Sequence, residues 1–408
     1  MKPLGPIPTA FAAIDGELAI GGQTASALVA KAGGTPLFVY STDAVRRRIT
    51  ELRRALPNRL RIHYAMKANP YGPLLEFIAD EVDGLDIASG GELEQAREAG
   101  FLPREISFAG PGKRDEELLA AIKSGVTLNL ESEGEAERAL EIARLRGLTP
   151  RLAIRVNPSF ELRGSGMKMG GGAKPFGVDE ERVPELARRI VDAGADWRGF
   201  HIYSGSQSLD SEAIIEAQAN TIALAARLAG EADVAVPHLN MGGGFGIPYF
   251  DKDRPLDIVA IGAALDRQLA DLPAALSGTQ FAIELGRYLV GEAGVYLTRI
   301  VDRKESHGST FLVTDGGLHH QLAASGNFGT VVRRNYPLAI ANKFSAEPEE
   351  VVNVVGCLCT PLDRLADQAH LPRADVGDTF AVFCAGAYGA SASPAAFLGQ
   401  GPAREMLV

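Results

Sequence analysis

The chain has 408 residues, of which 46% are hydrophobic and 23% charged, a composition typical of a soluble globular protein. Its 41 basic and 51 acidic residues give a net charge of −10, which disfavours a nucleic-acid phosphate backbone as the main partner. The three cysteines are too few for a disulfide framework, and no apolar run of about 18 residues is present. We therefore expect a cytoplasmic protein with no membrane span and no nucleic-acid partner.

Eight short apolar segments alternate with helical patterns over roughly the first two thirds of the chain. Each is too short for a helix, and most end near Gly, Ser or Asn, as buried parallel strands do. The intervening segments have apolar side chains at helical spacing. Eight such units predict a closed (βα)8 barrel of the TIM type, with an open doubly wound sheet as the alternative. The expected strands are Arg61–Ala65, Leu85–Ser89, Ile106–Gly110, Leu128–Glu131, Leu152–Asn157, Gly199–Ser204, Leu239–Gly242 and Phe281–Glu284.

The pattern changes after about residue 290. The strings VYLTRIVDRK, VVNVVGCLC and DTFAVFCAGAY are β-rich, with turns between them and no long helical pattern. The segment before Asp43 also contains strand-like strings. We therefore expect an α/β barrel domain of residues 40–287 and an all-β domain that combines residues 1–39 with residues 288–408.

The strongest local motif is HYAMKANP, at residues 63–70. Its Lys67 follows the first barrel strand, at the end where barrel active sites are built. A partly desolvated ammonium loses its proton more easily and can form a Schiff base, whereas an isolated lysine would usually be a plain surface residue. The string YAMKAN resembles the lysine motif of the fold type III decarboxylases that use pyridoxal 5'-phosphate, the diaminopimelate and ornithine decarboxylase family.

The resemblance continues in chain order and implies an alanine racemase-like fold with pyridoxal 5'-phosphate as cofactor. It implies that Asp86, in LDIAS, lies beside the Schiff base, and that Arg155, in LAIRVNP, lies near the phenolic oxygen of the cofactor. In GFHIYSGSQ, His201 matches the first histidine of the family motif, although a core histidine is equally expected. Tyr203 replaces the histidine that stacks on the pyridine ring; its ring can still stack, but it carries no imidazole.

The string GGGFG follows the seventh strand and resembles the family's phosphate loop. Glycines expose backbone N–H groups that can hold a phosphate, although a glycine cluster alone more often marks a tight turn. The resemblance implies phosphate contacts from Gly243, Gly244 and Gly246, with Ser206 as a hydroxyl donor.

The string IELGR ends the eighth strand and resembles the family's E-P-G-R motif. A carboxylate beside the pyridine nitrogen keeps that nitrogen protonated, and the resemblance assigns this role to Glu284. Arg287 is expected to hold a phosphate or a substrate carboxylate, since a guanidinium suits either. The alternative is a structural Glu–Arg pair at a strand end.

Two motifs in the β-rich part complete the resemblance. In GCLCTPLD, Cys359 and Asp363 match a Cys and an Asp that reach the partner subunit's site in the family. Thr360 stands where diaminopimelate decarboxylases have a Glu that meets the far ammonium of the substrate, and losing such a partner costs roughly 2–5 kcal/mol. In AGAY, Tyr388 matches a tyrosine near the phosphate, with a core tyrosine as the alternative.

The string HHQLAASGNFG resembles a side branch of the family that includes decarboxylases of glutamyl groups tethered to carrier proteins. Arg333 and its neighbour Arg334 are candidates for binding a substrate carboxylate or a carrier's phosphopantetheine, and Tyr336 is a further substrate candidate. A solvated basic pair is equally expected. We expect no metal at His319 and His320, because adjacent residues of a strand point to opposite faces.

The sequence therefore predicts a carboxy-lyase that removes the α-carboxylate of an amino acid or an aminoacyl-carrier substrate. We expect a homodimer with shared active sites, in which Lys67 carries the cofactor and Cys359 of the other subunit returns a proton. The alternatives are a meso-diaminopimelate decarboxylase, an amino-acid racemase on the same cofactor, and a non-catalytic look-alike that regulates a partner.

Overall fold

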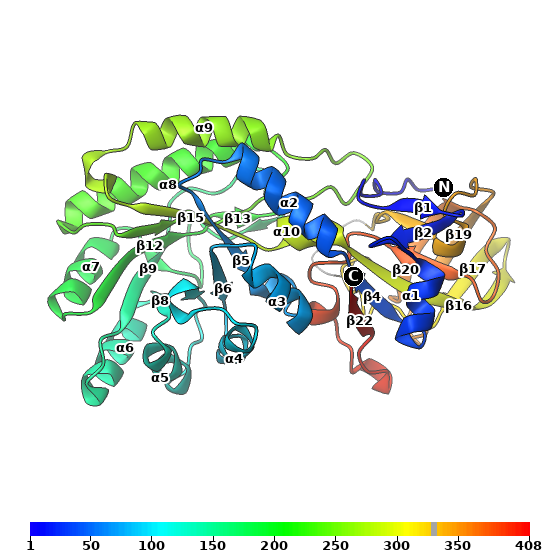
Figure 1. The fold of residues 1–408 in the computed structure, drawn as a ribbon, viewed down its shortest axis with the longest axis horizontal. Coiled ribbons are helices and arrows are strands. Elements are labelled where there is room, and N and C mark those ends of the chain that lie inside the picture. The colour runs from blue at the N-terminus through cyan, green and yellow to red at the C-terminus, as the bar shows by residue number, and fades with distance from the viewer. Residues whose placement is uncertain (328–332) are drawn as a thin grey trace. The chain divides into compact units, whose positions relative to one another are not determined.

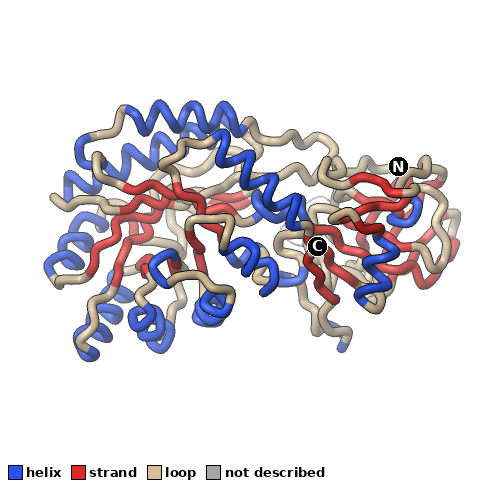
Figure 2. The backbone as a smooth tube through the Cα atoms, in the orientation of Figure 1, coloured by secondary structure: helices blue, strands red, loops and turns tan. Residues whose placement is uncertain are grey.

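The computed structural model describes residues 1–327 and 333–408, which pack as two compact units (Figures 1 and 2). The barrel unit comprises residues 49–246 and 255–285. The β unit comprises residues 1–48, 247–254 and 286–408. Residues 40–48, 247–254 and 286–287 thus pack with the β unit, whereas the sequence boundaries at 40 and 287 placed them with the barrel.

Eight parallel strands close the barrel unit in the order β5-β6-β7-β8-β9-β12-β14-β15, because β15 pairs back onto β5. The closed barrel is confirmed, and the open sheet is excluded. The strands are β5 (Arg61–Ala65), β6 (Gly84–Ile87), β7 (Ile106–Phe108), β8 (Thr127–Leu130), β9 (Arg151–Asn157), β12 (Asp196–Ile202), β14 (His238–Asn240) and β15 (Gln280–Leu285). The short strands β10 (Met167–Lys168), β11 (Val178–Asp179) and β13 (Gly205–Ser206) belong to loops.

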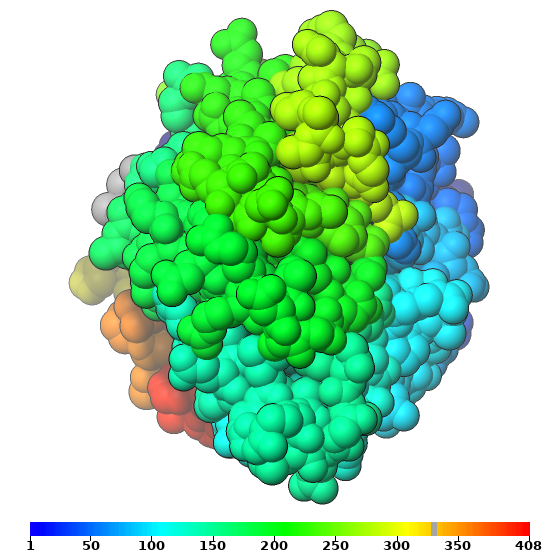
Figure 3. All heavy atoms as spheres, turned by 90° about the vertical axis from the view of Figure 1, so that its left-hand side faces the viewer, coloured from blue at the N-terminus to red at the C-terminus, as the bar shows by residue number. Residues whose placement is uncertain are grey.

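Amphipathic helices cover the outside of these strands, as Figure 2 shows, and the green and cyan atoms that fill most of the view in Figure 3 belong to the barrel unit. None of the described helices is long and apolar enough to cross a membrane. The helices are α2 (Thr42–Ala55), which begins in the β unit, α3 (Gly72–Ala79), α4 (Gly90–Glu98), α5 (Asp115–Ser124), α6 (Glu133–Arg146), α7 (Val183–Asp192), α8 (Ser211–Ala232) and α9 (Ile258–Ala270).

Serine caps fix two of these helices directly after their strands. The Ser89 hydroxyl accepts the amide of Glu92 at the start of α4, and the Ser132 hydroxyl accepts the amide of Glu135 at the start of α6, each at 3.1 Å. A hydroxyl acceptor satisfies one of the free N–H groups of the first turn. The caps therefore hold Glu92 and Glu135 near the C-terminal ends of β6 and β8.

The β unit is built on an eight-stranded sheet in the order β18-β21-β16-β17-β19-β20, with β4 pairing both β16 and β22. The N-terminal segment therefore joins this sheet through β4. Its strands are β4 (Leu37–Tyr40), β16 (Gly294–Ser306), β17 (Ser309–Thr314), β18 (Leu338–Ile340), β19 (Glu350–Val355), β20 (Arg364–Leu371), β21 (Thr379–Val382) and β22 (Arg404–Leu407). A small sheet of β1 (Ala12–Ile14), β2 (Glu17–Ile20) and β3 (Gln23–Thr24) precedes α1 (Ala25–Ala32), and α10 spans Arg287–Val290.

Apolar side chains from three sources form the core of the β unit. Leu18 and Ile20 of β2, Leu28 of α1, and Val295 and Leu297 of β16 have no exposed surface. Such burial contributes about 25 cal/mol per Å² of apolar surface. The core therefore ties the N-terminal segment to the sheet that carries the C-terminal motifs.

Two helix glycines give opposite predictions for substitution by alanine. A Cβ on Gly262, in α9, would lie 1.8 Å from the carbonyl oxygen of Ala55, whereas Gly230, in α8, is exposed with open space around it. We expect Gly262→Ala to lower the free energy of unfolding by about 1–3 kcal/mol through overpacking. Gly230→Ala should raise it by about 0.5–1 kcal/mol through helix propensity. Denaturant unfolding measures both, and equal effects would contradict this packing.

Candidate active site

Lys67 lies at the C-terminal end of the first barrel strand. A 3₁₀ turn, η1 (Met66–Ala68), follows β5 directly; Met66 and Ala68 are buried while Lys67 is exposed. The Lys67 Nζ is 5.8 Å from the centroid of the Tyr203 ring. The ammonium thus lies at the C-terminal end of the barrel beside an aromatic face, which attracts a cation, and its partial desolvation stays a prediction.

A line of polar side chains crosses the barrel interior beside Lys67. His201 Nε2 lies 3.0 Å from Glu284 Oε2, and the Asn240 amide donates to the same oxygen at 3.1 Å. Asn240 also reaches Asp86 Oδ1 at 3.4 Å, and His63 Nδ1 lies 3.2 Å from Asp86 Oδ2. Five consecutive strands of the closed sheet, β12, β14, β15, β5 and β6, thus bring the predicted residues Asp86, His201 and Glu284 together.

Glu284 is held as a carboxylate in this buried position. Burial alone would raise its pKa, but attraction to His201, and then to Lys67 and Arg155, outweighs burial and lowers the pKa below its ordinary value. Glu284 is only 7% exposed and His201 only 2%. His201 is therefore a buried histidine with a carboxylate partner rather than an apolar core residue.

The glycine loop after β14 needs its glycines for steric reasons. A Cβ on Gly243 would lie 1.9 Å from the carbonyl oxygen of Glu284, and one on Gly244 would lie 2.7 Å from that of Gly205. The amide of Gly242 donates to Asn240 Oδ1 at 2.9 Å, and that of Gly246 donates to the Ser208 carbonyl at 2.8 Å. The loop is thus anchored at both ends, and its main chain lies beside Glu284.

Ser206 is positioned by a short two-stranded sheet in the loops of the barrel unit. It lies in β13, which pairs antiparallel with β10 in register Met167 to Ser206. The Ser206 carbonyl also accepts the amide of Gly166 at 2.8 Å. The glycine-rich segment 164–172 therefore folds onto the Ser206 strand, and both lie close to Gly244 through Gly205.

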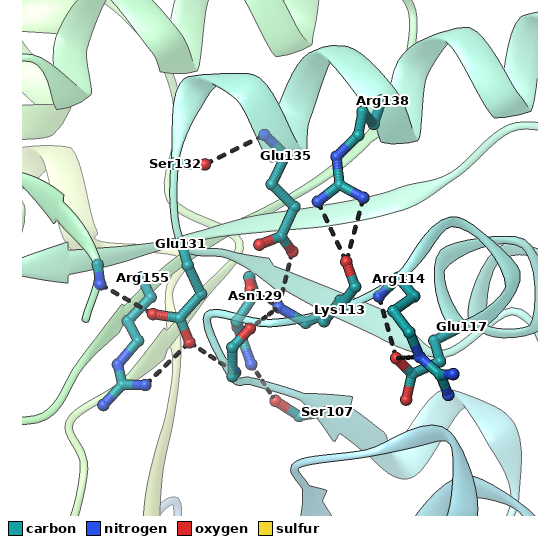
Figure 4. Close-up of polar contacts among 12 residues, drawn as sticks. Ser107, Lys113, Arg114, Glu117, Asn129, Glu131, Ser132, Glu135, Arg138 and Arg155 are labelled. Carbon is teal, nitrogen blue, oxygen red and sulfur yellow. Dashed lines mark hydrogen bonds and ion pairs between the residues drawn. The ribbon is translucent and has the colours of Figure 1, made fainter. Parts of the chain in front are cut away.

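Arg155 is positioned by Glu131, a residue that the sequence analysis did not single out (Figure 4). Arg155 donates to Glu131 Oε1 at 2.9 Å, and the amides of Gly110 and Gly177 donate to the two carboxylate oxygens at 2.5 and 2.8 Å. Burial would raise the pKa of Glu131, but attraction to Arg155 and Lys113 outweighs it and lowers the pKa. Three hydrogen bonds, one of them from a guanidinium, thus converge on one carboxylate.

A buried ion pair supports the same loops. Lys113 Nζ lies 2.7 Å from Glu135 Oε1 and also donates to the carbonyls of Gly110 and Asn129 at 2.7 and 2.9 Å (Figure 4). Burial lowers the pKa of Lys113 and raises that of Glu135, so it disfavours the charged form of both side chains. Their mutual attraction favours the charged forms and acts against burial. The pair ties the loop after β7 to α6, and that loop carries the amide that fixes Glu131.

A second group of predicted residues lies together in the β unit, around Arg287. Arg287 donates to the Tyr249 hydroxyl at 2.7 Å, and its guanidinium lies 4.7 Å from the centroid of Tyr388. Burial would lower the pKa of Arg287, but the surrounding tyrosines outweigh burial and raise it. Its Nε is buried without a hydrogen-bond partner in the described chain, so it remains available to an acceptor.

A series of aromatic rings leads from this group to the surface of the β unit. The rings of Tyr249 and Tyr336 lie 4.7 Å apart, and those of Tyr336 and Phe250 lie 5.7 Å apart. The guanidinium of Arg334, an exposed residue, lies 3.6 Å from the centroid of Phe250. Burial, and then repulsion by Arg364, lowers the pKa of the neighbouring Arg333. Of the two adjacent arginines, Arg334 is the one that lies against this series of rings.

Tyr388 adopts a strained backbone conformation, with φ of +54°. A bulky residue with positive φ is uncommon and usually marks a functional or tightly constrained position. Its ring is half-buried against Arg287. This environment differs from that of a plain core tyrosine, which was the alternative reading of AGAY.

Cys359 and Asp363 lie on one loop, residues 356–363, but in different surroundings, since Cys359 is exposed and Asp363 is buried. Both oxygens of Asp363 accept main-chain amides, from Leu318 at 2.7 Å and Leu358 at 2.9 Å, and Asp363 is only 2% exposed. This carboxylate therefore holds two loops together, and the catalytic role expected for Asp363 stays a prediction. Cys359 is exposed, and Thr360 is partly exposed beside it.

His319 and His320 lie in a turn, so the expected opposite orientation on a strand is wrong. Their ring centroids are 3.8 Å apart, and His320 contacts the Tyr296 hydroxyl and the Gly401 carbonyl, each at 3.0 Å. Burial lowers the pKa of His320 to about 4. Within residues 1–327 and 333–408, no group of three metal-ligating side chains includes this pair. Phe328 and Gly329 of the neighbouring motif lie outside the described residues.

Four residues of the site were missed by the sequence analysis: Glu131, Asn240, His63 and Lys113. Glu131 was read as the last residue of a strand, and His63 and Asn240 lay inside quoted strings without a role. Asn240 ends β14 and Glu131 directly follows β8, at the end of the strands where barrel sites are built, whereas His63 lies in the middle of β5. That position was the available signal for Glu131 and Asn240. Lys113 gave none, since a lysine in a loop is usually solvated.

The chain resembles proteins of known family along most of its length. Residues 42–291 match the family "Pyridoxal-dependent decarboxylase, pyridoxal binding domain". The chain is 35% identical to the L-glutamyl-[BtrI acyl-carrier protein] decarboxylase of Niallia circulans, over 91% of this chain and 88% of that protein. It is also 35% identical to a diaminopimelate decarboxylase of Methanothermobacter thermautotrophicus, over 93% of this chain and 87% of the relative.

Solved structures agree with these sequence matches. A diaminopimelate decarboxylase of M. jannaschii in co-complex with L-lysine superposes with a TM-score of 0.85 at 25% identity, covering 98% of this chain and 93% of the other. The AQ1208 protein of Aquifex aeolicus gives a TM-score of 0.81 at 30% identity, covering 94% and 89%. The protein therefore belongs to the fold type III pyridoxal-phosphate-dependent decarboxylases, the diaminopimelate and ornithine decarboxylase family.

Proposed function

We propose that this enzyme removes the α-carboxylate of an aminoacyl group that is tethered to a carrier protein. The observation that carries the proposal is the exposed Arg334, which is joined through Phe250, Tyr336 and Tyr249 to the half-buried Arg287. One arginine is thus available to a phosphate at the surface, and the other to a substrate carboxylate within. The relative from Niallia circulans, named for an acyl-carrier substrate, supports this reading.

The residues of the barrel mouth fit pyridoxal phosphate. Lys67 supplies the amine, the loop 242–246 supplies main chain that only glycine allows, and Glu284 supplies a buried negative charge. The second nitrogen of His201, Nδ1, is buried without a hydrogen-bond partner in the described chain, which is expected where a polar group completes the site. Bound there, the cofactor supplies an electron sink for the charge left when carbon dioxide departs.

The chain's own residues prepare that chemistry. Glu284 is kept charged by His201 and held in place by Asn240, so it can retain a proton on an aromatic nitrogen. Tyr203 offers a flat ring face at the mouth, and Arg155, fixed by Glu131, offers a guanidinium to a phenolic oxygen. The negative charge of Glu284 favours decarboxylation over the racemase alternative.

Diaminopimelate decarboxylase activity is the second candidate, because relatives of that name reach 35% identity. Thr360 argues against it. Its amide and hydroxyl form a turn with Leu358 and Leu362 at 2.8 and 3.3 Å, and it carries no charge for a far ammonium. The far ammonium of diaminopimelate would therefore lack a charged partner here, and losing such a partner is costly when the ammonium is removed from water.

We further propose that two subunits share each active site. Cys359 and Leu362 are exposed on the loop that Asp363 pins, so the loop is presented rigidly to a second copy of the chain. A cysteine thiol is one of the side chains that can return a proton as a general acid.

Substrate choice tests the main proposal. We expect labelled carbon dioxide from an L-glutamyl carrier protein and much less from free L-glutamate or meso-diaminopimelate. Arg334→Gln should raise the KM for the carrier-bound substrate roughly tenfold, about 1.4 kcal/mol, and leave kcat unchanged. Arg373→Gln, an exposed arginine of the same unit, is the control. Faster turnover of free diaminopimelate than of any carrier would overturn the proposal.

Glu131→Gln tests the positioning of Arg155. All three groups that face Glu131 are donors, so a glutamine amide must lose at least one hydrogen bond. We expect the dissociation constant of pyridoxal phosphate to rise roughly 10- to 100-fold, read from the absorbance of the bound cofactor. Glu137→Gln, on the exposed face of α6, should leave it unchanged. Equal constants for both variants would contradict the role of Glu131.

Mixed dimers test the shared site. Lys67→Ala and Cys359→Ala proteins should each be inactive, because one lacks the cofactor lysine and the other the proposed proton donor. Mixing them under conditions that exchange subunits should restore activity, since a mixed dimer has one site with both residues. If subunit exchange is shown by mass spectrometry and no activity returns, each site lies within one chain.

A further inference from the structure

A cavity of about 60 Å³ lies at the N-terminal end of the barrel, opposite to the end that carries Lys67. Since a single buried water needs roughly 10–15 Å³ of such space, this cavity has room for several waters or one small ion. Most of its polar walls come from residues at the starts of strands. Arg61 of β5, Arg151 of β9, His238 of β14 and Gln280 of β15 are first residues, and Arg198 is the third residue of β12.

The cavity walls carry more positive than negative charge. Arg151 Nε and Arg198 Nη1 each lie 3.3 Å from a different oxygen of Asp196, so two guanidinium groups share one carboxylate. The arginine side chains are 18% and 19% exposed, whereas that of Asp196 is 41% exposed and better hydrated. The single negative charge of Asp196 therefore offsets the two positive charges of Arg151 and Arg198 only in part.

Arg61 adds a third charge with neutral partners. It donates to the carbonyl oxygen of Asp83 and to Gln280 Oε1, the latter at 3.4 Å. The nearby carboxylate of Asp83 is occupied by Arg53 at 2.6 Å. Among the described residues, Glu105 is the one carboxylate that lines the cavity, and it pairs with the exposed Arg104 at 3.7 Å.

Two groups on the wall show what this positive surplus does. Burial, and then repulsion by Arg198, Arg61 and Arg151, lowers the pKa of His238 to about 4, so His238 is neutral at pH 7 and contacts Arg198 without adding charge. The Nε of Arg198 is buried without a hydrogen-bond partner in the described chain. An unpaired guanidinium donor inside a protein is costly and calls for an acceptor.

We propose that this cavity binds a small tetrahedral oxyanion such as inorganic phosphate, held by the guanidinium groups of Arg61, Arg151 and Arg198. Guanidinium groups prefer oxyanions because parallel N–H donors match their oxygens. The bound ion supplies the negative charge that Asp196 provides only in part, and it accepts the free N–H of Arg198. The site is independent of the proposed substrate.

The inner wall of this oxyanion site is also the floor of the catalytic site. His63 and Asn240 line the cavity, and the same two side chains contact Asp86 and Glu284 on the other side. An ion that orders this wall therefore stabilises the barrel and the base of the catalytic site together.

Thermal unfolding of the holoenzyme at fixed ionic strength tests the site, with inorganic phosphate as the probe. The cofactor fills its own phosphate site, so phosphate should act at the cavity. We expect the Tm to rise by roughly 3 °C and to saturate. Arg198→Gln should abolish the rise, while Arg144→Gln, an exposed pair with Glu141 on α6, should retain it. Equal rises in both variants would overturn the proposal.

Crystals of the wild-type holoenzyme soaked in selenate give a second test that needs no variant. An anomalous peak within hydrogen-bond distance of Arg198 supports the oxyanion site. A cavity filled by ordered water alone, with selenate present in the crystal, overturns it. A parallel bromide soak that fills the cavity while selenate does not would show a halide site instead, and would also overturn it.

Discussion

The pairing of β15 with β5 is the constraint on which the catalytic site depends. In that register Glu284 lies opposite His63, and in the next pair Ala65 lies opposite Asp86. Because side chains alternate between the two faces of a strand, a slip of one residue at this closure would turn Glu284 out of the barrel. The bridge by Asn240 between Glu284 and Asp86 exists only in the observed register. The pairing that closes the barrel therefore also positions the side chains of the cofactor site.

The chemistry at the mouth is controlled by positive groups that hold carboxylates charged. Glu284 and Glu131 both lie in surroundings that would raise the pKa of a carboxyl, and in both cases cationic neighbours reverse the effect. Each carboxylate then directs one partner, His201 or Arg155. Such pairs add little net stability, because desolvation offsets their attraction. Their value lies in fixing geometry, which is what a cofactor site requires.

The sequence predicted the barrel well because each strand is a short buried run and each helix an amphipathic one, so local pattern and global fold agree. It predicted Lys67, Asp86, His201 and Glu284 through motifs, and the structure brings them together. It could not distinguish Arg333 from Arg334, since which of two adjacent arginines stacks on Phe250 depends on a distant segment. It also missed Glu131, whose partners at 110, 155 and 177 come together only when the strands associate.

The same dependence on tertiary structure explains the two ends of the barrel. Arginines at the first positions of β5 and β9 are unremarkable in sequence, because charged residues commonly precede strands. Only the closed barrel collects them around one cavity, just as it collects Asp86 and Glu284 at the opposite end. His63 and Asn240 lie between these two sets of charges and contact the acidic one directly. The closed barrel thus places Asp86 and Glu284 on one side of His63 and Asn240, and the arginine-lined cavity on the other.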